Sequence, residues 1–169
     1  LNYLISVNGE KRVLRRPPVG PVQPGSNDMA RESRILMHLW KAFPLAPRCH
    51  HFCDDPAILG APFFIMEYRR GLVIGGTMPD GLPADAGRGL GRMLAEQLAA
   101  FHAVDPTAVD LDTLGNTDGY LARTLKGWTK RAVAAWDGNA PPALATLADW
   151  LGSRLIVDAP ATLIHNDFK

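Results

Sequence analysis

Five side chains of this sequence have types and an order that could act on a phosphate group and on a hydroxyl group. Arg15 and Arg16 end the second strand of a predicted hairpin, and Glu32 follows in the first turns of a predicted helix. His165 and Asp167 come after a short apolar segment near the other end of the chain. A guanidinium can bind two phosphate oxygens, a glutamate can hold that cation, and an aspartate can orient or accept the proton of a hydroxyl. This order of residue types predicts phosphoryl-transfer chemistry.

Each of these residues also has an ordinary structural explanation. Arg15 and Arg16 can be solvated ends of a strand, and Glu32 can be an exposed helix charge worth about 0.2–0.5 kcal/mol in a local pair. His165 and Asp167 can belong to a turn after a strand, which is the commoner case for an isolated His-x-Asp. The order of the three features along one chain favours the chemical interpretation over the structural one.

The composition is that of an ordinary globular protein. The chain has 169 residues, of which 47% are hydrophobic and 21% are charged, which suits a buried core and excludes wholesale disorder. Its formal net charge of +1 argues against a broad nucleic-acid-binding surface, which needs a surplus of Lys and Arg. No apolar run reaches the ~18–20 residues of a membrane span, and the first residues carry no secretory signal. Two cysteines cannot form a disulfide framework, so the sequence predicts a reduced, cytoplasmic setting without a membrane partner.

The first part of the chain predicts a small β-rich region with one helix. Residues 1–16 are typical of a hairpin, because Tyr3, Ile5 and Val7 alternate with their neighbours before the turn formers Asn8 and Gly9, and residues 11–16 run back. After a proline-rich loop, apolar residues at helical spacing predict a helix over residues 29–43, which Pro44 ends. A short strand is expected after residue 47, a turn at residues 54–56, and a buried strand at residues 62–68.

The second part of the chain predicts a mostly helical region. Glycines and prolines between residues 71 and 83 separate it from the first part. Beyond them, leucine and tryptophan residues recur at helical spacing. The expected elements are a helix of about 20 residues after residue 84, a helix over residues 119–136, a helix from Pro142 with inward leucines up to Leu155, and a short strand at residues 162–164.

Residues 49–53 (CHHFC) could suggest a metal site. A tetrahedral zinc site needs ligands that converge on one point, usually from two separated pairs. Four candidates within one short segment converge poorly, and alternate side chains of a strand point to opposite faces. A half-buried strand with outward polar positions is the better interpretation, and no metal ligand is predicted in this chain.

Five segments give the chain a resemblance to a known family. They are RVLRR at residues 12–16, RESRIL at residues 31–36, GAPFFIMEY at residues 60–68, AAFHAVD at residues 99–105 and LIHNDF at residues 163–168. In this order they resemble the aminoglycoside phosphotransferase and choline kinase-like family, in particular a branch found beside acyl-CoA dehydrogenase domains. The resemblance implies an α+β, protein-kinase-like fold, with a β-rich N-terminal lobe that carries one helix and a mainly helical C-terminal lobe.

The resemblance also implies a division of the chain. Residues 1–68 would form the N-terminal lobe, residues 69–83 the hinge and linker, and residues 84–169 a partial helical lobe that ends in the catalytic loop. In such folds, a glycine-rich loop precedes these elements and metal ligands follow the catalytic aspartate. We therefore expect the chain to be a fragment of a longer enzyme, without measurable phosphoryl transfer of its own.

On the nucleotide side, the resemblance implies roles for five residues. Arg15 matches the strand lysine that contacts ATP in protein kinases. The arginine departs from that lysine but keeps the positive charge and allows a two-point contact with phosphate. Glu32 matches the helix glutamate that holds this cation. Met66, Glu67 and Tyr68 match the hinge, whose backbone groups would bond the edge of adenine.

On the acceptor side, the resemblance implies roles for the end of the chain. Asp167 matches the catalytic aspartate, which would accept or orient the proton of the acceptor hydroxyl. His165 matches a histidine that braces the catalytic loop. Lys169 stands where protein kinases carry a phosphate-contacting lysine, and Asn166 replaces the glycine that this family usually has.

The implied function is that of an ATP-dependent small-molecule kinase. The γ-phosphoryl group of Mg-ATP would pass to a hydroxyl of a small metabolite or antibiotic-like acceptor, with magnesium ligands expected beyond Lys169. The implied partners are a nucleotide and a hydroxyl compound, with no nucleic acid and no membrane. Two alternatives stay open: a non-catalytic kinase-like module that binds a nucleotide or a partner without turnover, and an unrelated α+β domain with chance matches.

Overall fold

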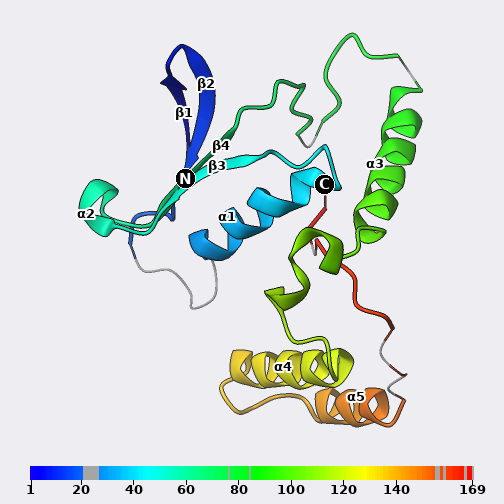
Figure 1. The fold of residues 1–169 in the computed structure, drawn as a ribbon. Helices are drawn as coiled ribbons and strands as arrows, with labels where there is room; N and C mark the ends of the chain where they lie inside the picture. Colours follow the sequence, from blue (N-terminus) through cyan, green and yellow to red (C-terminus); the bar gives the residue numbers. More distant parts are fainter. Residues whose placement is uncertain are drawn as a thin grey trace. The chain divides into compact units, whose positions relative to one another are not determined.

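The computed structural model divides the chain into two compact units (Figure 1). One unit contains Leu1–Leu114 and Thr162–Lys169, and the other contains the chain between them. The structure describes residues 1–20, 27–75, 77–83, 85–154, 157, 159–165, 167 and 168. Asn166 and Lys169, two positions of the predicted catalytic loop, lie outside the described residues. The division into lobes at residues 69–83 stays a prediction.

An antiparallel sheet forms one layer of the larger unit. Its strands are β1 Asn2–Val7, β2 Glu10–Arg15, β3 Cys49–Cys53 and β4 Phe63–Glu67, in the order β1-β2-β4-β3. Asn8 and Gly9 connect β1 and β2 with φ angles of 53° and 81°, the positive values that a two-residue turn matched to the strand twist requires. The predicted hairpin and the two further strands of this region are confirmed.

Helix α1, Met29–His38, packs on one face of this sheet (Figure 1). Asp28 caps the helix, because its carboxylate accepts a hydrogen bond from the Arg31 backbone N–H at 3.0 Å. This bond satisfies one of the open donors of the first turn. Met29 and Phe64 are buried in the core between the helix and the sheet, so the sheet and α1 form one packed layer pair.

A second core joins α1 to the segment that follows helix α3, Ala86–His102. This segment contains two short 3₁₀ turns, η2 Thr107–Val109 and η3 Asp112–Leu114. Leu111 lies between them and is 1% exposed. The buried members of this core are Leu39, Phe43, Ala46, Phe101, Val104, Val109 and Leu111. Helix α1 therefore has one apolar core toward the sheet and another toward the end of α3.

Two predicted elements of the first part end differently in the structure. The helix predicted over residues 29–43 ends as a 3₁₀ turn, η1 Leu39–Lys41, because the chain tightens ahead of Pro44, which cannot continue a helix. The turn predicted at residues 54–56 leads into a single helical turn, α2 Pro56–Leu59. Both differences lie at element ends, where local signals fix the type of structure better than its limits.

The strand predicted at residues 162–164 is not formed in the described part of the chain, and this prediction is wrong. The hydroxyl of Thr162 donates to the carbonyl of His102 at the end of α3, and Leu163 packs against the second core. A strand needs a neighbouring strand to pair its N–H and C=O groups, whereas this segment contacts a helix end. Its apolar pattern reflects one anchoring side chain, Leu163.

The smaller unit is a pair of packed helices, α4 Tyr120–Ala135 and α5 Pro142–Gly152. Both helices agree with the sequence pattern. The leucines predicted to face inward on α5 are only partly covered, since Leu147 is 52% and Leu151 is 39% exposed. Leu155, the last leucine of that pattern, lies outside the described residues.

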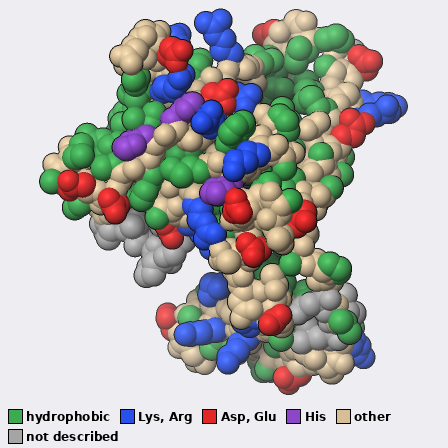
Figure 2. Space-filling model, in the orientation of Figure 1, with side chains coloured by type: hydrophobic (Ala, Val, Ile, Leu, Met, Phe, Trp, Pro, Cys, Tyr) green, Lys and Arg blue, Asp and Glu red, His purple; other side chains and the backbone are tan. Residues whose placement is uncertain are grey.

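Arginines cover part of the exposed aromatic surface of this unit. The guanidinium of Arg131 lies over the Trp128 ring at 4.2 Å, and that of Arg154 lies over the Trp150 ring at 4.5 Å. Such cation–π contacts shield an indole face while its edge stays in water. Figure 2 shows basic side chains at the surface of both units. Within the described ranges, no helix has the length and apolarity needed to cross a membrane.

The second core predicts a large difference between two leucine variants. Leu111→Ala removes a side chain that is 1% exposed, so we expect the free energy of unfolding to fall by about 2–5 kcal/mol. Leu45→Ala is the control, because Leu45 precedes the core residue Ala46 in the sequence but is itself 57% exposed; its loss should stay within about 1 kcal/mol. Chemical denaturation measures both values, and equal losses would contradict the assigned core.

Candidate functional site

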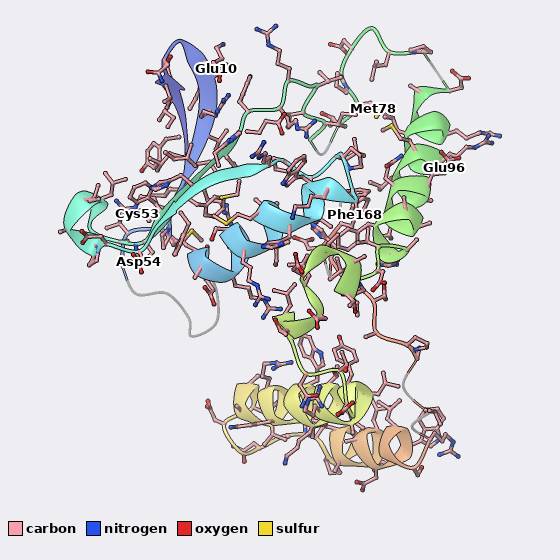
Figure 3. All side chains as sticks on the ribbon, in the orientation of Figure 1. Glu10, Cys53, Asp54, Met78, Glu96 and Phe168 are labelled. Atoms are coloured by element: carbon pink, nitrogen blue, oxygen red, sulfur yellow. The ribbon has the colours of Figure 1, made fainter. Side chains whose placement is uncertain are left out.

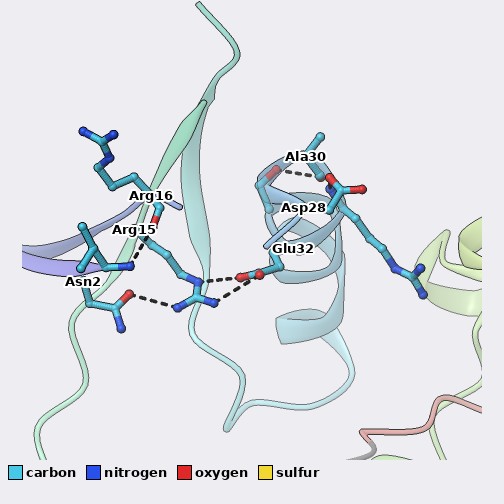
Figure 4. Close-up of polar contacts among 9 residues, drawn as sticks. Asn2, Arg15, Arg16, Asp28, Ala30 and Glu32 are labelled. Atoms are coloured by element: carbon cyan, nitrogen blue, oxygen red, sulfur yellow. Dashed lines mark hydrogen bonds and ion pairs between the residues drawn. The ribbon is translucent and has the colours of Figure 1, made fainter. Parts of the chain in front are cut away.

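Arg15 and Glu32 form a two-point ion pair between the sheet and α1 (Figure 4). The Nε of Arg15 donates to Glu32 Oε2 at 2.5 Å, and Nη2 donates to Oε1 at 3.2 Å. The two side chains are 29% and 32% exposed, so both charges are partly removed from water and remain within reach of a ligand. The predicted contact between this strand cation and this helix carboxylate is confirmed.

Strand pairing and helix geometry place these two side chains. Arg15 is the last residue of β2 and pairs across the hairpin with Asn2, whose Oδ1 accepts a further bond from Arg15 Nη1 at 3.3 Å. Glu32 lies in the first turn of α1, where the helix dipole favours a carboxylate. Arg16, the alternative cation, points away from Glu32 (Figure 4) and donates to the Leu59 carbonyl at 2.9 Å. The strand cation of this site is therefore Arg15.

The face of the sheet that carries Arg15 also offers apolar surface. Side chains two residues apart on a strand share a face, so Val13 lies on the side of Arg15, and its partner across the hairpin is Leu4, which is 58% exposed. A guanidinium has five N–H donors, and the three bonds to Glu32 and Asn2 leave two of them for an anion. The arrangement suits a ligand that combines a flat apolar part with a phosphate group.

The predicted hinge residues follow one another at the end of β4. Met66 packs against the core between the sheet and α1. Glu67 ends the strand, and its backbone N–H donates to the Arg48 carbonyl at 2.9 Å. Tyr68 comes next, with the Lys11 ammonium 5.7 Å from the centroid of its ring. Tyr68 is therefore the first residue whose backbone has left the sheet.

Arg69 holds this segment in place, a role that the sequence did not reveal. Its Nη2 lies 2.9 Å from Glu67 Oε2 and donates to the carbonyls of Pro44 at 2.9 Å and Ala46 at 3.2 Å. One guanidinium thus joins the end of β4 to the loop between α1 and β3. Two adjacent arginines after an apolar strand look like a solvated strand end, so no local signal distinguishes Arg69 from Arg70.

His165 and Asp167 lie in the segment that runs past the end of α3. The His165 ring contacts two phenylalanine rings edge to face. The distance between ring centroids is 6.0 Å to Phe101 and 5.4 Å to Phe168. Figure 3 labels Phe168. Because Phe101 is buried in the second core, these contacts anchor the segment, as a bracing residue must. Asp167 lies in a bend and is exposed. Its role as catalytic aspartate stays a prediction.

A cavity of about 430 Å³ lies on the other face of the sheet. Arg12 lines this cavity and stands three positions from Arg15 on β2, so the two side chains point to opposite faces. A bulge in β3 turns two consecutive histidines, His50 and His51, toward the cavity. Burial and then the charges of Arg12 and Arg48 lower the pKa of His50, against a smaller opposing effect of nearby glutamates. This cavity is separate from the Arg15–Glu32 pair.

Residues 49–53 form a partly buried strand, as their pattern predicts. Cys49 is 5% exposed, and this burial raises the pKa of its thiol. A hydrogen bond to the backbone of His51 lowers the pKa and offsets part of that rise. Cys53 at the other end of β3 is half-buried. Among the residues that the structure describes, no three His, Cys, Asp or Glu side chains converge to hold a metal ion.

The sheet, the helix on one of its faces and the ion pair between them belong to an α+β, kinase-like fold. The chain is similar to a solved protein from Ralstonia eutropha described as a "putative aminoglycoside phosphotransferase", with a TM-score of 0.72 and 25% sequence identity. The similarity covers 91% of this chain and 44% of that one. The chain belongs to the phosphotransferase enzyme family, whose profile matches residues 1–169.

Two curated relatives contain a similar segment within much longer proteins. Acyl-CoA dehydrogenase family member 10 of Mus musculus is 32% identical over 167 residues, which are 99% of this chain and 16% of that protein. Acyl-CoA dehydrogenase family member 11 of Gallus gallus is 30% identical over 170 residues, which are 99% of this chain and 21% of that protein. The resemblance to this branch of the family is confirmed, and the chain spans about a fifth or less of these relatives.

The environments of Cys49 and Cys53 predict different thiol reactivities. The thiolate is the reactive form, and a buried thiol with a raised pKa supplies little of it, so Cys53 should react with a disulfide reagent about 10-fold faster or more. Single Cys→Ser variants isolate each thiol for rate measurements near pH 8. Unfolded in urea, the two variants should react alike, and equal rates in the folded protein would contradict the burial of Cys49.

Proposed function

We propose that this chain forms the nucleotide-binding part of an ATP-dependent phosphotransferase, which transfers the γ-phosphoryl group to a hydroxyl of a small molecule. The observation that carries the proposal is the two-point contact between Arg15 and Glu32, at 2.5 and 3.2 Å. Membership of the phosphotransferase enzyme family supports the reaction type. Beyond family membership, the proposal adds that ATP is the phosphoryl donor and that a hydroxyl is the acceptor. Both cysteines are free thiols, which suits the reducing cytoplasm as the place of the reaction.

Arg15 would bind phosphate oxygens through the two N–H groups that its bonds to Glu32 and Asn2 leave open. Glu32 orients the guanidinium before the nucleotide arrives, so binding does not have to order a long, flexible side chain. Because both side chains are partly buried, their charges act through a lower effective dielectric than that of water. The apolar surface of Leu4 and Val13 on the same face would lie against the base.

The backbone of Tyr68 would bond the edge of adenine. The N–H of Glu67 already donates to the Arg48 carbonyl, whereas Tyr68 follows the end of the strand, where its backbone would be available to a ligand. Met66 would contribute by packing beneath this segment, since its side chain lies against the core. The contacts of Arg69 would keep the segment in one conformation, so the base meets a preformed surface.

Asp167 would orient the acceptor hydroxyl and take its proton during transfer. The hydroxyl oxygen forms a bond to the γ-phosphorus, the bond from that phosphorus to the bridging oxygen breaks, and ADP leaves. His165 would keep Asp167 in place through its contacts with Phe101 and Phe168, and a phosphate contact by Lys169 stays a prediction. Magnesium would neutralise phosphate charge, but the described residues offer no group of three ligands for it, so we assign it no step.

Two arginine variants test the nucleotide site against a general effect of charge. In the natural, full-length protein, Arg15→Met should weaken Mg-ATP binding by about 10- to 100-fold, because charge-assisted hydrogen bonds are lost. Arg16→Met is the matched control, since Arg16 is the next residue and binds the Leu59 carbonyl instead; its affinity should stay within about threefold. Calorimetric titration measures both, and equal affinities for the two variants would remove Arg15 from the site.

A conservative change at Asp167 tests the chemical step. Asp167→Asn keeps the size of the side chain but cannot accept the proton, so we expect kcat to fall by about 10²–10⁴-fold while the Kd for Mg-ATP stays within about threefold. Release of ADP with a panel of amino alcohols, sugars and aminoglycosides gives the rates. Unchanged turnover would contradict the role of Asp167. Wild-type protein that binds ATP and transfers to none of these acceptors would favour the non-catalytic alternative.

A further inference from the structure

Helix α1 is also held on the side that faces away from the sheet. Arg34 Nη2 donates to Thr113 Oγ1 at 2.5 Å and to the Asp110 carbonyl at 3.2 Å. His38 Nδ1 lies 3.3 Å from Asp110 Oδ2 but forms no hydrogen bond with it. Thr113 and Asp110 belong to the segment after α3, which also contributes to the second core. Polar contacts therefore accompany the apolar ones on this side of the helix.

The geometry of α1 places these contacts away from Glu32. At about 100° per residue, Arg34 lies about 200° and His38 about 240° around the helix from Glu32. Arg34 and His38 are four residues apart and share one face. Glu32 therefore reaches toward the sheet, while the other two side chains reach toward the segment after α3. One helix connects both sets of contacts, so a rotation that breaks one set displaces the other.

The backbone of Asp110 is shaped for this contact. Its φ and ψ of 55° and 33° are left-handed, a conformation that Asp adopts more readily than most residues. Its neighbours Val109 and Leu111 are 2% and 1% exposed, so the core fixes the chain on both sides. As a result, the carbonyl and the carboxylate of Asp110 both contact α1.

The exposure of the contact between His38 and Asp110 indicates what it does. The side chain of Asp110 is 73% exposed and that of His38 is 28% exposed, and pairs this open to water contribute little to stability. The apolar core beside them resists separation of the elements but has no preferred direction. Hydrogen bonds do have a direction, so the two bonds of Arg34 can fix the rotation of α1, and the His38–Asp110 contact adds attraction on the same face.

We propose that Arg34, His38 and Asp110 are positioning residues for the nucleotide site. They set the rotation of α1 and thereby hold Glu32 at hydrogen-bond distance from Arg15. This inference rests on the proposed function, because nucleotide binding is where the effect appears. A helix shift of about 1–2 Å is a common step in proteins that change state, and it is large enough to lengthen the bonds of Glu32 beyond their useful range.

The test is Mg-ATP binding by the natural, full-length protein and its variants Arg34→Gln, His38→Gln and Asp110→Asn. Asparagine tolerates the left-handed backbone of Asp110. Each variant should weaken binding by about 3- to 30-fold, most for Arg34→Gln, which removes two bonds, while the thermal unfolding midpoint changes little. The matched controls are Arg31→Gln, one turn earlier on α1, and Asp112→Asn, two residues after Asp110; both residues are exposed, and their variants should stay within about twofold.

A double variant separates positioning from a general loss of structure. If Arg34 acts through Glu32, then Arg34→Gln should cause little further loss of affinity once Glu32→Gln has already broken the pair with Arg15. The two free-energy effects would then be far from additive. A less stable fold would instead reduce binding by the same factor in both backgrounds. Arg34→Lys keeps a donor near the Asp110 carbonyl and should recover part of the affinity.

The outcomes distinguish this inference from the function on which it rests. Unchanged affinity in all three single variants, or additive losses in the double variant, would overturn the positioning role and leave the proposed function standing. Absence of Mg-ATP binding by the wild-type protein would overturn both. If Arg34→Gln fails to fold, His38→Gln and Asp110→Asn decide the question, because each changes only the contact between these two side chains.

Discussion

The two hydrogen bonds between Arg15 and Glu32 form only if much of the larger unit is folded and packed. They require the end of a strand and the start of a helix to stay at hydrogen-bond distance, although the two residues are far apart in the sequence. The hairpin and its pairing with β4 fix Arg15. The cap at Asp28 and the buried Met29 fix the first turn of α1. Neither half of the pair is rigid without the packing behind it.

Helix α1 is held by packing on both of its sides. Toward the sheet it has an apolar core around Phe64, and toward the segment after α3 it has a second core around Leu111. Apolar burial supplies most of the cohesion, and the close packing of both cores already limits how far the helix can rotate. The directional contacts on each side, Glu32 toward the sheet and Arg34 toward the segment after α3, narrow that range further. Cohesion and orientation thus come from different residues of one short helix.

Local signals in the sequence account for what could be predicted. Asn8 and Gly9 specify the hairpin turn by themselves, and the order of Arg15 and Glu32 along the chain was enough to expect their contact. The contacts of Arg69 and Asp110 could not be predicted, because each depends on carbonyl groups or side chains distant in sequence that only the folded chain brings close. The wrongly expected strand at residues 162–164 has the same origin, since a strand is defined by its neighbour.

Arginine at position 15 changes how such a site can be regulated. A lysine can be acetylated, which removes its charge, whereas methylation of arginine leaves the charge in place. A protein with lysine at this strand position has a covalent means to switch off its phosphate-binding cation, and this chain does not have that means at Arg15. Methylation would instead block the two-point hydrogen bonding of the guanidinium while leaving its charge. A modifying enzyme or a binding protein would then act on the contact between Arg15 and Glu32, at the guanidinium or through the angle of α1, and not on the charge of the cation.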